Sequence, residues 1–351
     1  MRFADGLQVS DGLRVERWTK RAGIFVLIAL ITLGALAFGP MVFSPGATER
    51  LSALFIYVIL AVMWNLLAGY GGLVSVGQQA FFGLGAYAAI RLSAAGVAVY
   101  PALLLAALVV GGLAVPIGEV MLRLSGGEFA IGMWVVAELA HLLVNLDPLV
   151  QGETGTSLIA LDAFAVAARR ADTYWASLAA MALALALVFL MLRGRLGTAL
   201  QAIRDDDVAA ASVGVRVLAT KRVVFVLAAA GAALAGALWL ATAITFQPHA
   251  YFSVQWTAYM IFMTLVGGLG TFEGPVLGAL LFFVIETAFG ASGVWYLVGL
   301  GAAALGFALF APRGLWGGFT ARFAPRLLPL GYHVVLARTL VAAPAKEGKA
   351  P

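Results

Sequence analysis

Apolar stretches of about twenty residues, separated by short polar segments, recur along most of this chain. As an α-helix, a stretch of this length crosses the hydrocarbon core of a bilayer, which is about 30 Å thick. The chain is 63% hydrophobic and only 11% charged, whereas roughly a quarter of the residues of a soluble domain are charged. The stretches do not alternate apolar and polar residues, as the strands of a transmembrane barrel do. The sequence therefore predicts an all-α, polytopic membrane protein.

Ten candidate spans follow from these stretches: 23–43, 51–69, 72–92, 99–122, 129–146, 172–192, 221–246, 256–270, 276–290 and 293–311. Glycine-rich turns join the second span to the third and the eighth to the ninth, so these pairs are expected to be either broken or re-entrant helices or simple hairpins. Three regions result: an N-terminal segment 1–22, a transmembrane domain 23–311 and a basic tail 312–351.

Residues Ala35, Leu36 and Ala37 resemble a signal-peptidase site. The apolar run continues beyond them to Phe43, which favours an uncleaved membrane anchor.

The distribution of basic residues predicts the orientation in the membrane, because Lys and Arg are enriched in cytoplasmic loops. With ten spans and a cytoplasmic N-terminus, all 22 Lys and Arg residues lie inside except Arg50, Arg91, Arg169 and Arg170. This bias favours an even number of spans with both termini in the cytoplasm.

The stretch GYGGLVSVGQQAFFGLGAYAAI, residues 69–90, has six glycines around Ser75, Gln78 and Gln79. These three polar residues share one helix face. Unwound backbone and amides at membrane depth are tolerated where they are buried in protein or line a water-filled path. A similar segment, GGLGTFEGPVLGA at 267–279, indicates an internal repeat around a transport path. Taken singly, each glycine is also explained by close helix packing.

In the span 129–146, Trp134, Glu138, His141 and Asn145 fall on one helix face. An ionisable residue inside a membrane is a candidate functional residue, so Glu138 and His141 are assigned to the translocation path. The alternative is that they pair with each other, or with a neighbouring helix, for packing alone.

Several classes of chemistry have no motif here. The chain has no cysteine, no Walker A motif and no H-E-x-x-H spacing among its three histidines. We therefore expect no ATPase activity of its own, no metal site and no cofactor. The net charge of +5 fits basic cytoplasmic loops and does not indicate a nucleic-acid partner.

The longest predicted cytoplasmic connection is RGRLGTALQAIRDDDVAAASVGVRVLAT, residues 193–220. Its middle, Thr198 to Val213, favours one short helix bracketed by Gly197 and Gly214. Such a helix is polar enough to leave the membrane and apolar enough to pack against a partner.

Five segments in order resemble the M-type permeases of the branched-chain amino acid ABC importer family, over about residues 50–318. They are GYGGLVSVGQQAFFGLGAYAA, RLSGGEFAIGMWVVAELAHLL with QGETGTSL, GTALQAIRDDDVAAASVGV with TKRVVFVLAAAGAALAGAL, GGLGTFEGPVLGA, and LFAPRGLWG. The polar N-terminal extension departs from this pattern. So does QGETGTSL (151–158), which has fewer glycines than expected. Related permeases for urea, amides or aromatic acids therefore stay open as alternatives.

The resemblance implies one subunit of a larger importer in the bacterial inner membrane. The expected partners are an H-type permease, two cytoplasmic ATPases and a periplasmic substrate-binding protein. The expected translocation path includes Ser75, Gln78, Gln79, Glu138 and His141. The residues expected to couple the permease to an ATPase, in a helix at about 197–214, are Gly197, Ala202, Arg204, Asp205, Asp206, Ala210 and Gly214. A different class, an ion-coupled secondary transporter, would use Glu138 and His141 instead.

Reporter fusions test the predicted topology. A fusion after residue 351 is expected to show activity only with a cytoplasmic reporter, and a fusion after residue 160 only with an external one, because the basic residues favour this orientation. The opposite pattern at either position would reject it.

Overall fold

The computed structural model describes residues 8–9, 13–16, 20–323 and 333–336. The chain divides into two compact units, a small one made of Met1–Ile31 with Arg326–Pro351 and a large one, Thr32–Pro325. Much of the predicted N-terminal segment and basic tail therefore lies outside the described residues.

A three-stranded antiparallel sheet joins the two ends of the chain within the small unit. Its strands are β1 (Gln8–Val9), β2 (Leu13–Glu16) and β5 (His333–Leu336), in the order β1-β2-β5. Leu13 faces Leu336 and Glu16 faces His333 across the β2–β5 pair. The sequence analysis predicted no strand in either segment.

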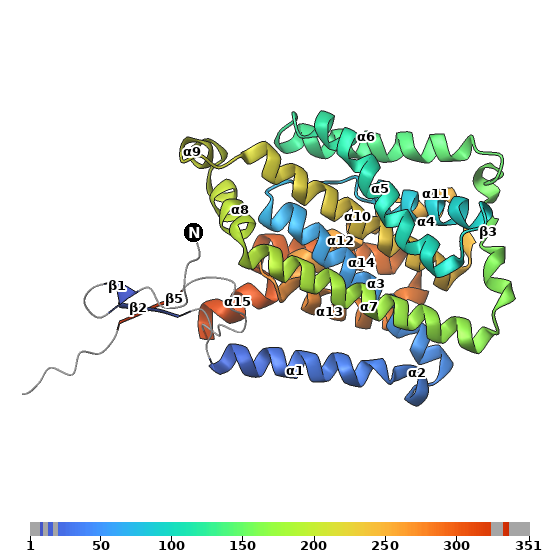
Figure 1. The fold of residues 1–351 in the computed structure, drawn as a ribbon, viewed down its shortest axis with the longest axis horizontal. Coiled ribbons are helices and arrows are strands. Elements are labelled where there is room, and N and C mark those ends of the chain that lie inside the picture. Colours follow the sequence, from blue (N-terminus) through green and yellow to red (C-terminus); the bar gives the residue numbers. More distant parts are fainter. Residues whose placement is uncertain (1–7, 10–12, 17–19, 324–332, 337–351) are drawn as a thin grey trace, which may run out of the picture. The chain divides into compact units, whose positions relative to one another are not determined.

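Helices form almost all of the large unit (Figure 1). In chain order they are α1 (Lys20–Ala37, which begins in the small unit), α2 (Gly39–Val42), α3 (Pro45–Asn65), the π-helical turn η1 (Leu66–Tyr70), α4 (Gln79–Ala94), α5 (Val99–Met121), α6 (Gly126–Asn145), η2 (Gly152–Thr154), η3 (Ile159–Ala163), α7 (Val166–Arg193), α8 (Arg195–Asp205), α9 (Asp207–Ser212), α10 (Val217–Ala243), α11 (Pro248–Tyr251), α12 (Val254–Gly267), α13 (Gly274–Phe289), η4 (Gly290–Ser292), α14 (Val294–Phe310) and α15 (Gly314–Phe323). Two short strands, β3 (Thr156–Ser157) and β4 (Thr245–Phe246), pair at one end of the bundle. The prediction of an all-α, polytopic membrane protein is confirmed.

Seven helical segments among the described residues are long and apolar enough to cross a membrane. They are Pro45–Tyr70, Val99–Met121, Gly126–Asn145, Val166–Arg193, Val217–Ala243, Gly274–Ser292 and Val294–Arg322. Helices α4 and α12 have only 16 and 14 residues, so at 1.5 Å per residue they fall short of the bilayer core. The count of ten spans stays a prediction.

Helix α10 lies at the centre of the bundle, packed against α3, α4 and α5. Its buried face carries mainly alanine and glycine, which lets neighbouring backbones come close. A Cβ atom placed on Gly85 of α4 would lie 2.0 Å from the carbonyl oxygen of Ala233, and one on Gly236 would lie 1.9 Å from that of Phe82. Helices α4 and α10 therefore pack together through glycine on both sides.

The helix that begins at Pro45 ends at Tyr70, and residues 71–78 are not helical. Gly72 has φ = +68°, a conformation that glycine adopts without steric cost. The predicted span 72–92 is thus broken, with its first residues unwound and the rest forming α4. A second interruption, 268–273, separates α12 from α13.

Two side chains of α7 hold the end of α1. The Tyr174 hydroxyl donates to the carbonyl oxygen of Leu36 at 2.7 Å, and Trp175 Nε1 donates to that of Ala37 at 2.9 Å. The segment resembling a signal-peptidase site is therefore bound to the helical bundle.

The close packing of α4 on α10 gives a stability prediction. Gly85→Ala is expected to lower the free energy of unfolding by about 1–3 kcal/mol, because the added methyl group must displace the Ala233 backbone. Gly112→Ala in α5 is the matched control, since no atom lies within 4 Å of a Cβ at that position. Thermal unfolding of the purified proteins in detergent measures both. Equal effects of the two substitutions would contradict the packing described here.

Candidate translocation and coupling sites

The unwound segment 71–78 is buried except at Gly72, Val74 and Val76, and it is hydrogen-bonded to its surroundings. Ser75 is fully buried; its carbonyl oxygen accepts from Trp64 Nε1 at 3.0 Å, and its hydroxyl accepts from the Gly77 amide at 3.3 Å. A Cβ at Gly77 would lie 1.9 Å from the Met133 carbonyl oxygen of α6. The buried part of the segment therefore packs against the helix that carries Glu138 and His141.

The two glutamines beside this segment have different surroundings. Gln79 bonds to Thr257 of α12: its backbone N–H donates to the threonine hydroxyl at 3.3 Å, and that hydroxyl donates to the side-chain Oε1 of Gln79. Gln78 is 1% exposed, and neither polar atom of its side chain has a hydrogen-bond partner among the described residues. A buried amide without a hydrogen-bond partner lowers stability, so a packing role does not explain why a glutamine occupies position 78.

Glu138, His141 and Asn145 lie at the end of α6, next to the predicted M-type segment 151–158. His141 Nε2 lies 2.8 Å from Glu153 Oε1 and its Nδ1 lies 3.5 Å from Glu138 Oε1. Asn145 Nδ2 donates to Glu153 at 2.5 Å. The Glu138 side chain is 61% exposed, whereas that of His141 is 12% exposed. His141 thus contacts both carboxylates.

Glu153 connects α6 with α11. Its second oxygen accepts from the His249 backbone N–H at 3.0 Å. Burial raises the pKa of this carboxyl, but the hydrogen bonds from Asn145 and the His249 N–H, together with the nearby His141, hold the pKa below its usual value. Glu153 therefore stays ionised as the acceptor that joins the two elements.

The predicted path residues form two groups linked through Phe252. The Phe252 ring stacks on His141, with ring centroids 5.6 Å apart. The same ring would lie 2.7 Å from a Cβ on Gly83 of α4. Ser75, Gln78 and Gln79 belong to the buried group at the start of α4, and Glu138 and His141 to the partly exposed group at the end of α6.

Asn65, at the end of α3, joins the two glycine-rich segments. Its Oδ1 accepts from the Gly270 N–H and its Nδ2 donates to the Thr271 carbonyl oxygen, both at 2.8 Å. A Cβ on Gly69 would lie 2.6 Å from the Gly270 nitrogen. We call this set, Asn65, Gly69, Gly270 and Thr271, the glycine junction. The internal repeat suggested by these segments stays a prediction.

Two further parts of the chain reach the glycine junction or the neighbouring Glu273. The guanidinium of Arg204, at the end of α8, lies against Gly270, since a Cβ there would be 2.2 Å from Arg204 Nη1. On the α15 side, Trp316 Nε1 donates to Glu273 at 3.1 Å. Four of the segments that carry the family resemblance therefore lie close together in the fold: 69–90, the 193–220 connection, 267–279 and 309–317.

The predicted coupling helix is two helices, which corrects the single helix expected over 198–213. α8 ends at Asp205 and α9 begins at Asp207. The reason is the extended backbone of Asp206, whose carboxylate caps α9 by accepting from the N–H groups of Val208 and Ala209 at 2.8 and 3.0 Å. An acceptor side chain at this position starts a new helix.

The residues expected to act in coupling face different ways. Ala210 is 2% exposed, so it packs against the chain itself, and a Cβ on Gly197 would collide with the Leu192 carbonyl oxygen. Arg204, Asp205, Asp206 and Gly214 are exposed and Ala202 is half-buried. Val208, by contrast, is 80% exposed although it is apolar. The outward surface of α9 is thus apolar around Val208, which the sequence analysis did not single out.

Sequence reasoning also missed Asn65, the partner of the unwound segment 268–273, and Thr257, the partner of Gln79. An asparagine at the end of an otherwise apolar span is a signal that could have found Asn65, because polar side chains at membrane depth need partners. Thr257 gave no such signal.

These features define a polytopic membrane protein with buried, unwound backbone at its centre and a short helical pair at one end. A model of the family described as the permease component of branched-chain amino acid transport systems matches residues 47–311, and the chain belongs to this family.

Two curated relatives carry the name high-affinity branched-chain amino acid transport system permease protein LivM. The one from Escherichia coli (strain K12) is 27% identical over 346 residues, covering 89% of this chain and 80% of that protein. The one from Salmonella typhimurium (strain LT2) is 27% identical over 317 residues, covering 82% and 74%. No solved structure matches the chain significantly.

The contrast between the two glutamines gives a prediction. Gln78→Leu is expected to reduce uptake while leaving the stability unchanged, because Gln78 has no partner to lose. Gln79→Leu is the control and is expected to cost about 1–3 kcal/mol of stability, since it removes the Oε1 acceptor of the buried Thr257 hydroxyl. Uptake in vesicles and thermal unfolding measure the two effects. Undiminished uptake by the Gln78 variant would favour a packing role for both residues.

Proposed function

We propose that this chain is a permease subunit of an ATP-driven ABC importer for branched-chain amino acids. The observation that carries the proposal is the family match over residues 47–311, and the names of both relatives agree with it. Its partners are an H-type permease, two cytoplasmic ATPases and a periplasmic binding protein. The complex lies in the bacterial inner membrane with both termini of this chain in the cytoplasm.

Coupling proceeds through α8 and α9. An element seated on an ATPase moves with it as a rigid body when the ATPases close. Val208 is the apolar contact on the exposed side of α9, and Asp205 and Asp206 lie beside it. On the inner side, Arg204 lies against Gly270. Movement of α8 is therefore transmitted to the glycine junction, where the unwound segment 268–273 meets the end of α3 and η1.

The substrate path passes the buried group at the start of α4. Gln78 offers a donor and an acceptor that no described residue uses, so it is available to a hydrated substrate. Glu138 and His141 line the outer approach to this path, near the 151–158 segment. Glu153 keeps that segment attached to both α6 and α11.

A substitution on α9 tests the function. Val208→Asp in the assembled complex is expected to abolish transport-linked ATP hydrolysis, because it introduces a charge into an apolar contact that must be desolvated. Insertion into the membrane should be normal, since α9 lies outside the spans. Val166→Asp is the matched control: Val166 is also exposed, at 53%, but lies at the opposite end of the bundle.

The same preparation separates this function from the alternatives. For an ion-coupled transporter, uptake would survive Val208→Asp and collapse when the proton or sodium gradient is dissipated at constant ATP. That result would overturn the proposal. Urea, short amides and aromatic acids serve as competing substrates in the uptake assay, and preference for one of them over leucine would revise the substrate.

A further inference from the structure

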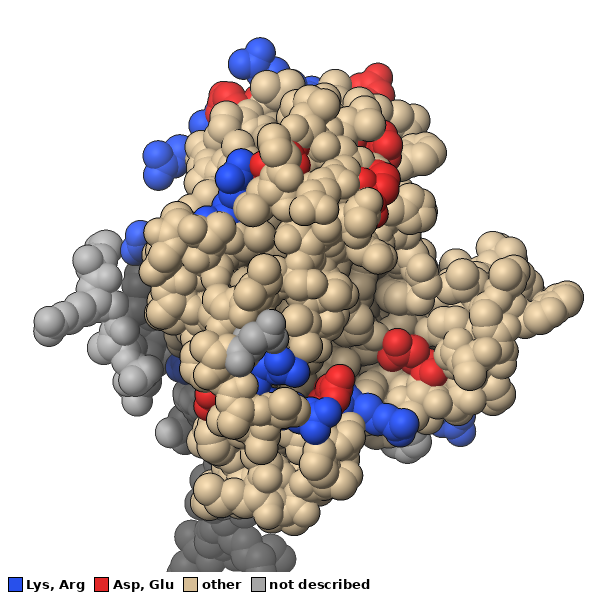
Figure 2. Space-filling view, turned by 90° about the vertical axis from the view of Figure 1, so that its right-hand side faces the viewer, with Lys and Arg blue, Asp and Glu red and all other residues tan. Residues whose placement is uncertain are grey.

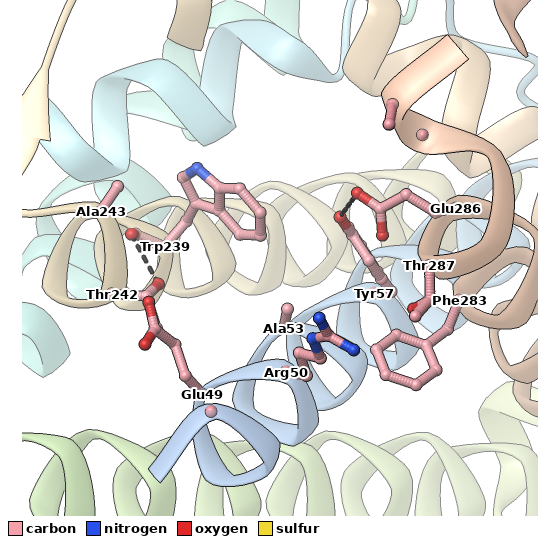
Figure 3. Close-up of a pocket in the computed structure, with 13 residues that line it drawn as sticks. Glu49, Arg50, Ala53, Tyr57, Trp239, Thr242, Ala243, Phe283, Glu286 and Thr287 are labelled. Atoms are coloured by element: carbon pink, nitrogen blue, oxygen red, sulfur yellow. Dashed lines mark hydrogen bonds between the residues drawn. The ribbon is translucent and has the colours of Figure 1, made fainter.

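A cavity of about 580 Å³ opens between three helices at the end of the bundle opposite α8 and α9. It is lined by the first turns of α3, the last turn of α10, and the last turns of α13 with η4 (Figure 3). Its volume is within the range of small-ligand sites. By the predicted topology it faces the outside.

Two charged side chains of opposite sign line this cavity, Arg50 of α3 and Glu286 of α13 (Figure 3). Glu286 accepts a hydrogen bond from the Tyr57 hydroxyl at 2.8 Å. Among the residues that the structure describes, neither Arg50 nor Glu286 forms an ion pair, whereas neighbouring Glu49 lies 3.8 Å from Arg170. An ionisable residue in a membrane span is a candidate functional residue, and these two line a cavity without a counter-ion in the described part of the chain.

The partial charges at the helix ends around the cavity are arranged in the same way as the charges of Arg50 and Glu286. The N-terminal end of α3 carries partial positive charge, and the C-terminal ends of α10 and α13 carry partial negative charge. Arg50 lies near the positive end and Glu286 near the negative ends. The field across the cavity is therefore that of a dipole, and a zwitterion aligned against it is favoured over a ligand of either single charge.

Aromatic and small apolar side chains complete the walls. Trp239 of α10, Tyr57 and Phe283 present ring surface, and Ala53 leaves room beside Arg50 (Figure 3). The centroids of Tyr57 and Trp239 are 5.9 Å apart. On the face seen in Figure 2, which is this end of the bundle, uncharged side chains predominate, and acidic and basic ones lie side by side next to a hollow.

We propose that this cavity binds an α-amino acid with an aliphatic side chain. Arg50 binds the carboxylate, Glu286 held by Tyr57 binds the ammonium group, and the side chain packs against Trp239 and Phe283. The proposal rests on the proposed function, which sets the side of the membrane that the cavity faces. It adds to the binding protein a second site, within the permease itself, where the substrate is recognised as a zwitterion. Neither charged residue was among the sites predicted from sequence.

Ligand analogues test the proposal on the unmodified protein. The assembled transporter, without binding protein or ATP, is titrated with L-leucine, with isopentylamine, which lacks the carboxylate, and with 4-methylpentanoate, which lacks the ammonium group. Saturation-transfer NMR measures the three affinities. Leucine is expected to bind at least about tenfold more tightly than either analogue, because only leucine engages both charges. Equal binding of all three, or no binding of leucine, would overturn the proposal.

Substitutions assign the binding to this cavity and not to another subunit. Arg50→Gln and the isosteric Glu286→Gln are each expected to weaken leucine binding at least about tenfold, and Tyr57→Phe to weaken it less. Arg169→Gln in α7 is the matched control: it removes a basic side chain that does not line the cavity. Unchanged affinity in both the Arg50 and Glu286 variants would refute the site.

Leucine uptake by the wild-type complex distinguishes the two proposals. ATP-dependent uptake without leucine binding in the cavity would reject the site and leave the proposed function intact. Absence of ATP-dependent uptake would reject the proposed function, while the titrations above would still decide whether the cavity binds leucine.

Discussion

The side-chain amide of Asn65, at the end of α3, holds the stretch of backbone between α12 and α13 that has left its helices. Unwound backbone inside a membrane protein is costly, because each unpaired polar group in a low-dielectric interior costs several kcal/mol. Asn65 supplies an acceptor to Gly270 and a donor to Thr271, so one side chain satisfies both kinds of group. The small size of Gly69 lets this stretch approach so closely.

The position of Asn65 also links the two ends of the bundle. Helix α3 begins beside the cavity that contains Arg50 and Tyr57 and ends at Asn65. Fifteen residues of helix separate Arg50 from Asn65, a rise of roughly 22 Å. At the other end, Arg204 lies against the same junction. The cavity and the glycine junction therefore lie at opposite ends of one helix, α3.

Most of the helices could be predicted from the sequence, because an apolar stretch of sufficient length has few alternatives in a bilayer. The exceptions have local causes. One coupling helix was expected where Asp206 divides the segment into α8 and α9. Residue composition favours helix on both sides of Asp206, and only its capping bonds reveal the break. The terminal strands were missed because β2 and β5 are too short to show a pattern and pair across more than 300 residues.

The sequence by itself determined the membrane class, most of the spans, the basic asymmetry and the family motifs. These properties depend on local composition and order, which a linear pattern records directly. Only the tertiary structure decided that Gly77 touches α6 while Gly69 meets Gly270, that Ala210 faces inward and Val208 outward, and that Arg50 and Glu286 share a cavity. Each of these facts depends on how the helices pack against one another. The periodicity of a helix predicts which of its residues share a face, but it does not specify which other helix packs against that face.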